Sequence, residues 1–231
     1  CSSDLYGTPR FLDDLDYELI AQHPKFFIGY SDITALQCAF AVETGLVTIS
    51  GVMAAVEMAA EGGIDPYTEE MFWNLISKPM SGQVLKNPSD MPHAVLSDGQ
   101  GQGPLVGGCL SLFNNLMGTP YFPNVAGGIM VLEDIGENAQ HLDRMLSQFK
   151  MAGFFHGEER INGLMFGQFI DTWENGDEDD FLLDELVRDI IGKVDFPIVS
   201  SLAYGHGMRK MTLPLGANVK LNGDDGSLTL L

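Results

Sequence analysis

The chain has 231 residues, of which 45% are hydrophobic, with a formal net charge of −20 and a pI near 4.3. A chain of this length can bury a sizeable core, as one large domain or two modest ones. The charge excludes nucleic acid and anionic membrane surfaces as expected partners, because no basic patch can neutralise phosphates. No apolar run is long enough to cross a bilayer.

The predicted elements indicate an α/β fold, because short apolar runs alternate with amphipathic stretches. In chain order they are a strand at 25–30, a helix at 32–44, a strand at 46–50, helices at 66–77 and 109–117, a strand at 127–133, a helix at 137–152, a strand at 162–169, a helix at 178–192, and strands at 197–202, 210–215, 218–222 and 227–231. Residues 223–226, with the sequence GDDG, predict a hairpin turn between the last two strands.

Residues 79–104 predict a linker, because they are rich in Pro, Gly, Ser and Asp and show little periodicity. The expected domains are an N-terminal α/β lobe over 1–78 and a C-terminal β/α lobe over 105–231. The chain opens on a helix-like stretch, without the strand that normally begins a parallel α/β sheet. We therefore expect N-terminal α/β units to be missing from it.

The cysteines and histidines favour neither disulfides nor a metal site. Cys1, Cys38 and Cys109 are an odd number without a C-x-x-C pair, which indicates a reducing compartment. The five histidines lack the H-x-x-x-H and H-E-x-x-H spacings of zinc sites. We expect a cytoplasmic protein with no metal and no other cofactor.

Ser31 lies between the first predicted strand and the first predicted helix, in the stretch FFIGYSDITAL. Serine is a favoured helix N-cap. A serine nucleophile instead needs a tight turn that exposes Oγ and aims the next backbone N–H at a developing oxyanion. Gly29 permits such crowding, but Ile33 replaces the second glycine of G-x-S-x-G. The local sequence leaves both roles open.

A serine nucleophile also needs a base, and an acid that orients the base. His206 follows Gly205 and precedes another glycine, so backbone or substrate can approach it closely, although a loop histidine bonded to backbone is the alternative. Glu133 ends a strand that is apolar on both faces, where α/β folds place their sites. A buried carboxylate there needs a partner such as His206. Asp134 and Glu137 are the other candidates for the acid.

Four stretches of the sequence together resemble the LD-carboxypeptidases of serine peptidase family S66. They are PKFFIGYSDITAL, VGGCLSLFNNLMGTPYFP, GGIMVLEDIGENAQHLDRML and YGHGMRKMTLPLGA, and the resemblance runs from about residue 6 to the end. It implies a Rossmann-like N-terminal lobe, here incomplete, and a C-terminal swivelling-type β/α lobe. The implied catalytic triad has Ser31 as nucleophile, Glu133 as acid and His206 as base. The expected oxyanion and substrate-binding residues are Asp32, through its N–H, Gly29 and Gly205.

The resemblance implies a cytoplasmic serine carboxypeptidase of peptidoglycan recycling. Such an enzyme removes the terminal D-alanine of a murein tetrapeptide from an L-configured centre. We expect the murein peptide as partner, a homodimer, and neither nucleic acid nor membrane. Arg10, Arg209 and Lys210 stay open as the cation for the substrate carboxylate.

Two alternatives remain open, one within the enzyme class and one outside it. One is an immunity-type hydrolase of peptidyl-nucleotide amides, and the other is a catalytically silent peptide-binding or assembly protein. The silent alternative draws on residues 3–7, SDLYG, where the family usually has an R-G-G-Y-G-like loop. Two further departures are Ser50-Gly51-Val52 in place of H-G-P and Gly107-Gly108-Cys109 in place of G-G-N.

Overall fold

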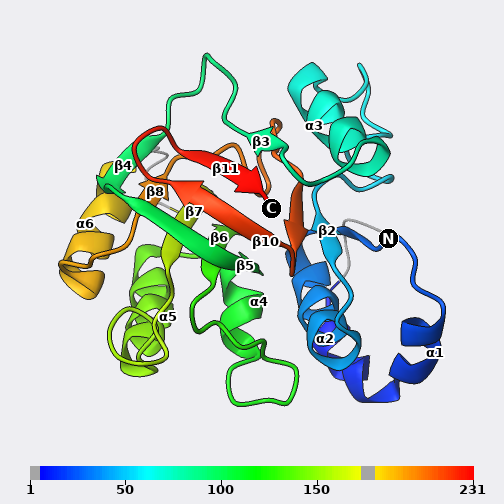
Figure 1. Cartoon of the computed structure of the whole chain (residues 1–231), viewed down its shortest axis with the longest axis horizontal. Helices are drawn as coiled ribbons and strands as arrows, with labels where there is room; N and C mark the ends of the chain where they lie inside the picture. Colours follow the sequence, from blue (N-terminus) through cyan, green and yellow to red (C-terminus); the bar gives the residue numbers. More distant parts are fainter. Residues whose placement is uncertain (1–5, 173–179) are drawn as a thin grey trace.

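The computed structural model describes residues 6–172 and 180–231, which form a mixed α/β fold with two sheets (Figure 1). The N-terminal elements are η1 (Thr8–Asp14), α1 (Tyr17–Gln22), β1 (Ile28–Gly29), η2 (Ser31–Ile33), α2 (Thr34–Thr44), β2 (Thr48–Ser50) and α3 (Pro66–Ser77). The later elements are β3 (Val84–Leu85), β4 (Ala94–Ser97), β5 (Gln100–Cys109), α4 (Leu110–Asn115), β6 (Ile129–Ile135), α5 (Ala139–Met151), β7 (Gly163–Ile170), α6 (Asp180–Ile191), β8 (Ile198–Ser200), β9 (Leu213–Leu215), β10 (Asn218–Asn222) and β11 (Ser227–Leu230). The predicted α/β class is confirmed.

The larger sheet has eight strands in the order β3-β11-β10-β5-β6-β7-β8-β4. Its centre, β5 to β8, is parallel, and antiparallel strands flank it on both sides. β10 and β11 pair as the predicted hairpin, with Asn222 opposite Ser227. The carboxyl ends of the parallel strands therefore meet along one edge, where α/β folds gather their functional side chains.

The sheet buries both of its faces in separate apolar clusters. Met130 and Leu132 of β6 pack with α2, α4, α5 and α6 on one face. Ile129 and Val131 pack on the other face with side chains of β9, β10 and β11. The sequence of β6, which is apolar at every position from 129 to 132, follows directly from this two-sided burial.

Three of the helices begin at a side-chain cap that the sequence supplies. Asp16 accepts a hydrogen bond from Leu19 N at the start of α1. Asp65 and Asn138 do the same for α3 and α5. Such caps satisfy backbone N–H groups that a helix leaves unpaired, and they explain why the predicted starts of α3 and α5 lie within two residues of those observed.

The prediction of an irregular linker over 79–104 is wrong, because this segment contains β3, β4 and the first half of β5. Its glycines, which weaken a strand signal, are required by packing. A Cβ at Gly101 would lie 1.9 Å from the carbonyl oxygen of Asn162, and one at Gly103 would lie 2.0 Å from that of Gly127. The division of the chain into two lobes at this segment stays a prediction.

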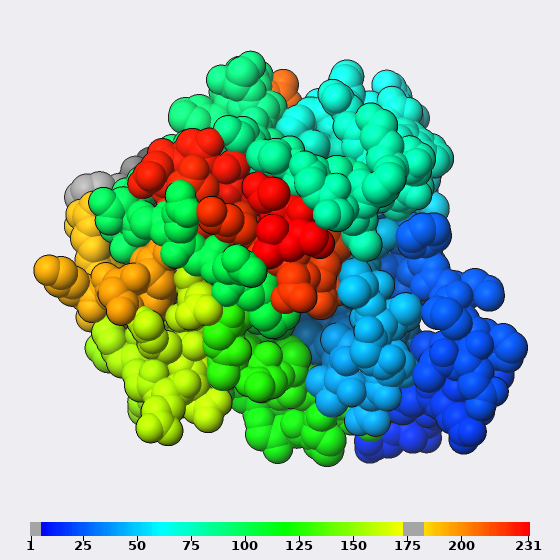
Figure 2. All heavy atoms as spheres, viewed as in Figure 1, coloured from blue at the N-terminus to red at the C-terminus, as the bar shows by residue number. Residues whose placement is uncertain are grey.

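The smaller sheet joins distant parts of the chain. It has the order β1-β2-β9, with β1 and β2 parallel and β9 antiparallel to β2. β9 comes from the predicted C-terminal lobe, and the residues just after it bond to Leu105 of β5. Figure 2 shows the red C-terminal strands lying against both the cyan and the green parts of the chain. β9 thus fixes how β2 sits against the larger sheet.

No helix in the described part of the chain is both long and apolar enough to cross a membrane.

Candidate active site

Glu133 lies on β6, on the face of the larger sheet that points away from helices α4 to α6. Side chains alternate along a strand, so Glu133 shares its face with Ile129 and Val131, which belong to the cluster around β9 to β11. Its side chain is fully buried. A buried carboxylate is unfavourable unless a hydrogen-bonding partner meets it.

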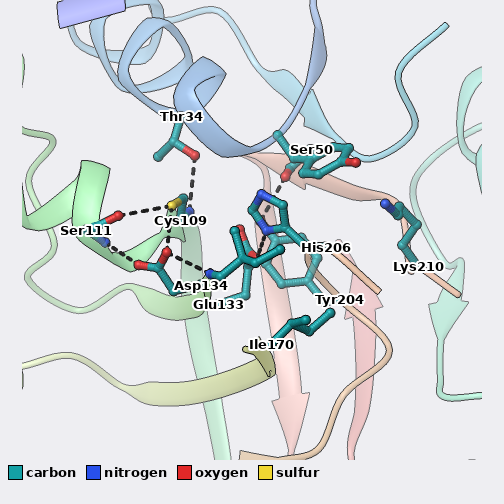
Figure 3. A network of polar contacts seen from close by, with 12 residues as sticks. Thr34, Ser50, Cys109, Ser111, Glu133, Asp134, Ile170, Tyr204, His206 and Lys210 are labelled. Atoms are coloured by element: carbon teal, nitrogen blue, oxygen red, sulfur yellow. Dashed lines mark hydrogen bonds and ion pairs between the residues drawn. The ribbon is translucent and has the colours of Figure 1, made fainter. Parts of the chain in front are cut away.

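His206 is that partner. Its Nδ1 lies 2.7 Å from Glu133 Oε2, and the two side chains are 12% and 1% exposed (Figure 3). Burial raises the pKa of the Glu133 carboxyl, although the hydrogen bond from His206 acts in the opposite direction. Because Nδ1 is held by Glu133, Nε2 is the ring nitrogen left to exchange a proton with a nucleophile.

Gly205 makes the contact between His206 and Glu133 sterically possible. Its φ is +115°, and a Cβ there would lie 2.4 Å from Glu133 Oε2. Gly167 on β7 is also close, since a Cβ there would lie 2.4 Å from the Tyr204 carbonyl oxygen. The observed role of Gly205 is therefore to clear space for the carboxylate, and its contact with substrate stays a prediction.

Ser31 occupies the tight turn that a nucleophile requires. Its φ is 64°, a left-handed conformation that is rare outside glycine. Its hydroxyl forms no hydrogen bond to any other residue in 6–172 or 180–231, so the N-cap interpretation gains no support. Backbone strain of this kind is concentrated at functional sites.

The ring of Tyr30 links Ser31 to the histidine. Tyr30 immediately precedes Ser31, and its ring contacts the His206 ring edge to face, with the centroids 5.0 Å apart. A hydrogen bond between Ser31 Oγ and His206 is absent among the described residues. Catalytic hydrogen bonds are often long before substrate binds, and the closer approach of Ser31 to His206 stays a prediction.

Asp32 and Gly29 shape the same turn from either side. The Asp32 carboxylate accepts a hydrogen bond from Thr8 N at 2.9 Å, and the Thr8 hydroxyl donates to the Asp32 carbonyl at 2.6 Å. A Cβ at Gly29 would lie 2.8 Å from Ile33 Cγ2, so only glycine lets the turn close. These contacts hold the backbone of Ser31 and Asp32. Their predicted roles toward an oxyanion and a substrate are not tested by them.

Neither alternative acid contacts His206. Asp134 points to the opposite face, where Oδ2 accepts from Ser111 N at 2.7 Å and Oδ1 lies 3.4 Å from Cys109 Sγ (Figure 3). Glu137 is paired with His141 at the start of α5. Of the three candidate carboxylates, only Glu133 forms a hydrogen bond with His206.

Two of the three sequence departures lie wholly within the described residues. Ser50 Oγ and the hydroxyl of the buried Tyr204 are hydrogen-bonded at 2.8 Å, beside Glu133. Cys109 is buried next to Glu133 across β5 and β6, and burial raises the pKa of its thiol. Residues 3–5 of the altered N-terminal stretch lie outside the described residues.

The structure adds a buried charged group that sequence reasoning missed. Glu57 accepts hydrogen bonds from Lys210 Nζ and from the Tyr30 hydroxyl through the same oxygen, Oε1. The signal in the sequence was a single carboxylate inside the apolar run GVMAAVEMAA. Among the candidate cations, Arg209 instead pairs with Asp90 at the surface.

Comparison with known proteins matches an N-terminal and a C-terminal part of the chain to one family. Residues 5–51 match the LD-carboxypeptidase N-terminal domain, and residues 102–221 match the LD-carboxypeptidase C-terminal domain. A relative from Streptomyces coelicolor is 34% identical over 100% of this chain and 70% of its own length. The probable murein peptide carboxypeptidase of Bacillus subtilis is 31% identical over 96% of this chain and 67% of its own length.

Solved structures agree with the sequence matches. The muramoyltetrapeptide carboxypeptidase from Oxalobacter formigenes superposes with a TM-score of 0.80 at 28% identity, over 99% of this chain and 76% of that one. The complex of MccF with glutamyl sulfamoyl guanosine, at a TM-score of 0.84, 22% identity, and coverage of 95% and 71%, is similar in fold alone. The chain is therefore a peptidase that belongs to the LD-carboxypeptidase family S66.

Proposed function

We propose that this protein is a serine-type L,D-carboxypeptidase that releases the terminal D-alanine of a murein tetrapeptide. The observation that carries the proposal is the buried contact of 2.7 Å between His206 Nδ1 and Glu133 Oε2, beside the turn that holds Ser31. Relatives named for murein peptide and muramoyltetrapeptide cleavage support this substrate class.

In the proposed reaction, Ser31 Oγ bonds to the scissile carbonyl carbon while His206 Nε2 takes the hydroxyl proton. The oxyanion lies at the Asp32 N–H. Glu133 keeps the imidazole in orientation and stabilises its charged form. When the C–N bond breaks, His206 returns the proton to the amine of D-alanine. A water then repeats the sequence on the acyl-enzyme and frees Ser31.

The biological setting follows from the substrate. A free murein tetrapeptide arises when peptidoglycan is degraded, so we place the reaction in peptidoglycan recycling in the cytoplasm, carried out by a homodimer.

The substrate can be tested directly. The protein is incubated with a tetrapeptide ending in D-alanine and, separately, with its all-L stereoisomer, and alanine release is followed by mass spectrometry.

We expect release from the first peptide and almost none from the second. Inverting the terminal centre misaligns the scissile carbonyl, and a displacement of about 1 Å can lower a rate by about 10²-fold. Equal cleavage of both peptides would contradict L,D specificity. Binding without release, with Ser31 intact, would favour the silent peptide-binding alternative.

A second candidate is an immunity-type hydrolase, which the fold similarity to MccF favours. An aminoacyl sulfamoyl adenosine serves as the probe in a parallel reaction. If only this compound is hydrolysed, the second candidate replaces the first. If the tetrapeptide and this compound are both hydrolysed, the one with the higher kcat/KM is the better substrate and indicates the main activity.

A further inference from the structure

A buried ion pair lies behind the tyrosine that precedes the candidate nucleophile. Lys210 and Glu57 are 2% and 9% exposed, although the chain carries only 12 lysines and arginines in all. Lys210 Nζ binds Glu57 Oε1 and also lies over the Tyr30 ring, 4.1 Å from its centroid. Figure 3 shows Lys210 reaching toward His206 from the side away from Asp134.

The Glu57 carboxylate is saturated with donors. Oε1 accepts from Lys210 and, at 2.9 Å, from the Tyr30 hydroxyl, and Oε2 accepts from Met53 N at 2.7 Å. These hydrogen bonds outweigh the effect of burial and hold the pKa of the Glu57 carboxyl below its ordinary value. A buried ion pair with every oxygen satisfied adopts one geometry, since a shifted partner leaves a charge unpaired.

Tyr30 is held on three sides by this arrangement. Its hydroxyl is fixed by Glu57, one surface of its ring lies under the Lys210 ammonium, and the ring meets His206 edge to face. A cation over an aromatic ring is most favourable when it is desolvated. Because Tyr30 and Ser31 are neighbours, the same contacts limit the movement of both the imidazole and the nucleophile backbone.

We propose that Tyr30, Lys210 and Glu57 are positioning residues for the triad, and that the ion pair sets the tilt of the His206 ring through the Tyr30 ring. The expected effect on kcat rests on the proposed function, whereas the expected effect on the position of the His206 ring does not. Lys210 is thereby assigned to Glu57 and Tyr30 rather than to the carboxylate of the substrate.

A set of variants separates the effect of the Lys210 and Glu57 charges from the effect of the Tyr30 ring, and separates both from a general loss of stability. Lys210→Met removes the cation and keeps an unbranched side chain that is one atom shorter, and the double variant Lys210→Met/Glu57→Gln removes both charges. Tyr30→Leu removes the ring, and Tyr30→Phe restores it without the hydroxyl. Lys86→Met is the matched control, because the exposed Lys86–Asp225 pair contacts neither ring. Each is measured for kcat, KM, Tm and the downfield proton NMR signal of the His206 Nδ1–H, which is assigned by its loss in His206→Gln.

We expect Tyr30→Leu and the double variant to lower kcat by about 10- to 100-fold with KM nearly unchanged, and to broaden the His206 signal. Lys210→Met alone should also lower Tm, because it leaves the Glu57 charge buried without its cation. The double variant should recover Tm but not kcat. Tyr30→Phe should lie between Tyr30→Leu and the original protein in kcat and in the His206 signal, because it keeps the ring but loses the hydrogen bond to Glu57. Lys86→Met should resemble the original protein in both.

Two results would overturn the inference: an unchanged His206 signal in Tyr30→Leu, or recovery of kcat together with Tm in the double variant. The second would make the ion pair purely structural. If the unaltered protein hydrolyses none of the peptides and the His206 signal still broadens as expected, the proposed function fails and the positioning role stands.

Discussion

At the scale of single residues, Ser31 combines a strained backbone with a hydroxyl that has no hydrogen-bond partner among the described residues. We predict that Ser31→Ala abolishes hydrolysis with little change in Tm, because the hydroxyl caps no helix. Ser31→Gly should also be inactive but should raise Tm, because glycine adopts φ 64° without the strain of about 1 kcal/mol or more that other residues incur. Melting curves and alanine release measure both. Turnover by an unstable Ser31→Ala variant would show that Ser31 is a cap.

Glu133 gives a prediction in which activity and stability change in opposite directions. Because burial raises the pKa of its carboxyl, the native protein binds this proton more tightly than the unfolded chain. Ionisation therefore lowers stability as the pH rises above the ordinary glutamate value of about 4.3. Glu133→Gln should lower kcat by on the order of 10³-fold or more. Its Tm relative to the original protein should increase between about pH 4 and pH 7. A Tm difference that does not vary with pH would contradict the burial argument.

Gly205 and Gly99 form a matched pair for testing the space beside Glu133. Both have a positive φ, +115° and +104°, but a Cβ at Gly205 would meet the Glu133 carboxylate, whereas a Cβ at Gly99 would meet nothing within 4 Å. Each alanine variant should lose about 1 kcal/mol of stability through backbone strain. Only Gly205→Ala should also lose hydrolysis. Kinetics and melting curves of the two variants decide, and equal activities would show that Glu133 tolerates displacement.

The contact between Glu133 and His206 could be predicted from sequence because each of the two residues had a local signal. Glu133 follows an apolar run, and His206 lies between glycines. The structure confirms that these two meet. Lys210 and Glu57 could not be paired in advance, because 153 residues separate them and nothing in the apolar run around Glu57 points to Lys210.

At the scale of elements, the strands buried on both faces were predictable and the glycine-rich strand was not. β6 and β7 begin within two residues of the predicted positions, since each contains an unbroken apolar run, at 129–132 and 164–166. β5 was missed because its glycines serve close contacts with backbone from other segments. A hydrophobic pattern in the sequence indicates which residues of a strand are buried. It does not indicate where backbone from another segment packs against the strand.

The β10–β11 hairpin supplies a prediction about acid stability. Lys86 and Ser227 bond to Asp225, which lowers the pKa of that carboxyl to about 2 and joins β3 to the turn. A lowered pKa stabilises the fold above the ordinary aspartate value of about 3.9, and this contribution is lost as the pH falls toward 2. The side chain of Asp225 is 44% exposed, so Asp225→Asn should lower stability by only about 0.2–1 kcal/mol at pH 7.

The difference between Asp225→Asn and the original protein should disappear near pH 2. Asp224→Asn in the same turn is the control, because no described residue bonds to its carboxylate. Thermal melts at both pH values measure the effect. A deficit that persists in acid would assign the loss to turn geometry rather than to charge.

At the scale of the whole molecule, β9 and the Lys210–Glu57 pair tie the first part of the chain to the last. We therefore predict one cooperative unfolding transition, in which far-UV circular dichroism, tryptophan fluorescence and the His206 proton signal change together. Independent lobes joined by a flexible linker would give two transitions. Observation of two would support the division into two lobes that the sequence of 79–104 predicts.

The pairing of β2 with β9 also has a consequence for synthesis on the ribosome. Thr48 lies opposite Leu215, so roughly 165 residues must be added after β2 before its partner exists. At about 5–20 residues per second this takes on the order of 10–30 s. During that interval β2 presents an open edge, which is the kind of surface that recruits other chains into aggregates. The nascent protein thus depends on residues 206–215 to cover the edge of β2 and to supply His206, and a chain that terminates before them would expose that edge and lack His206.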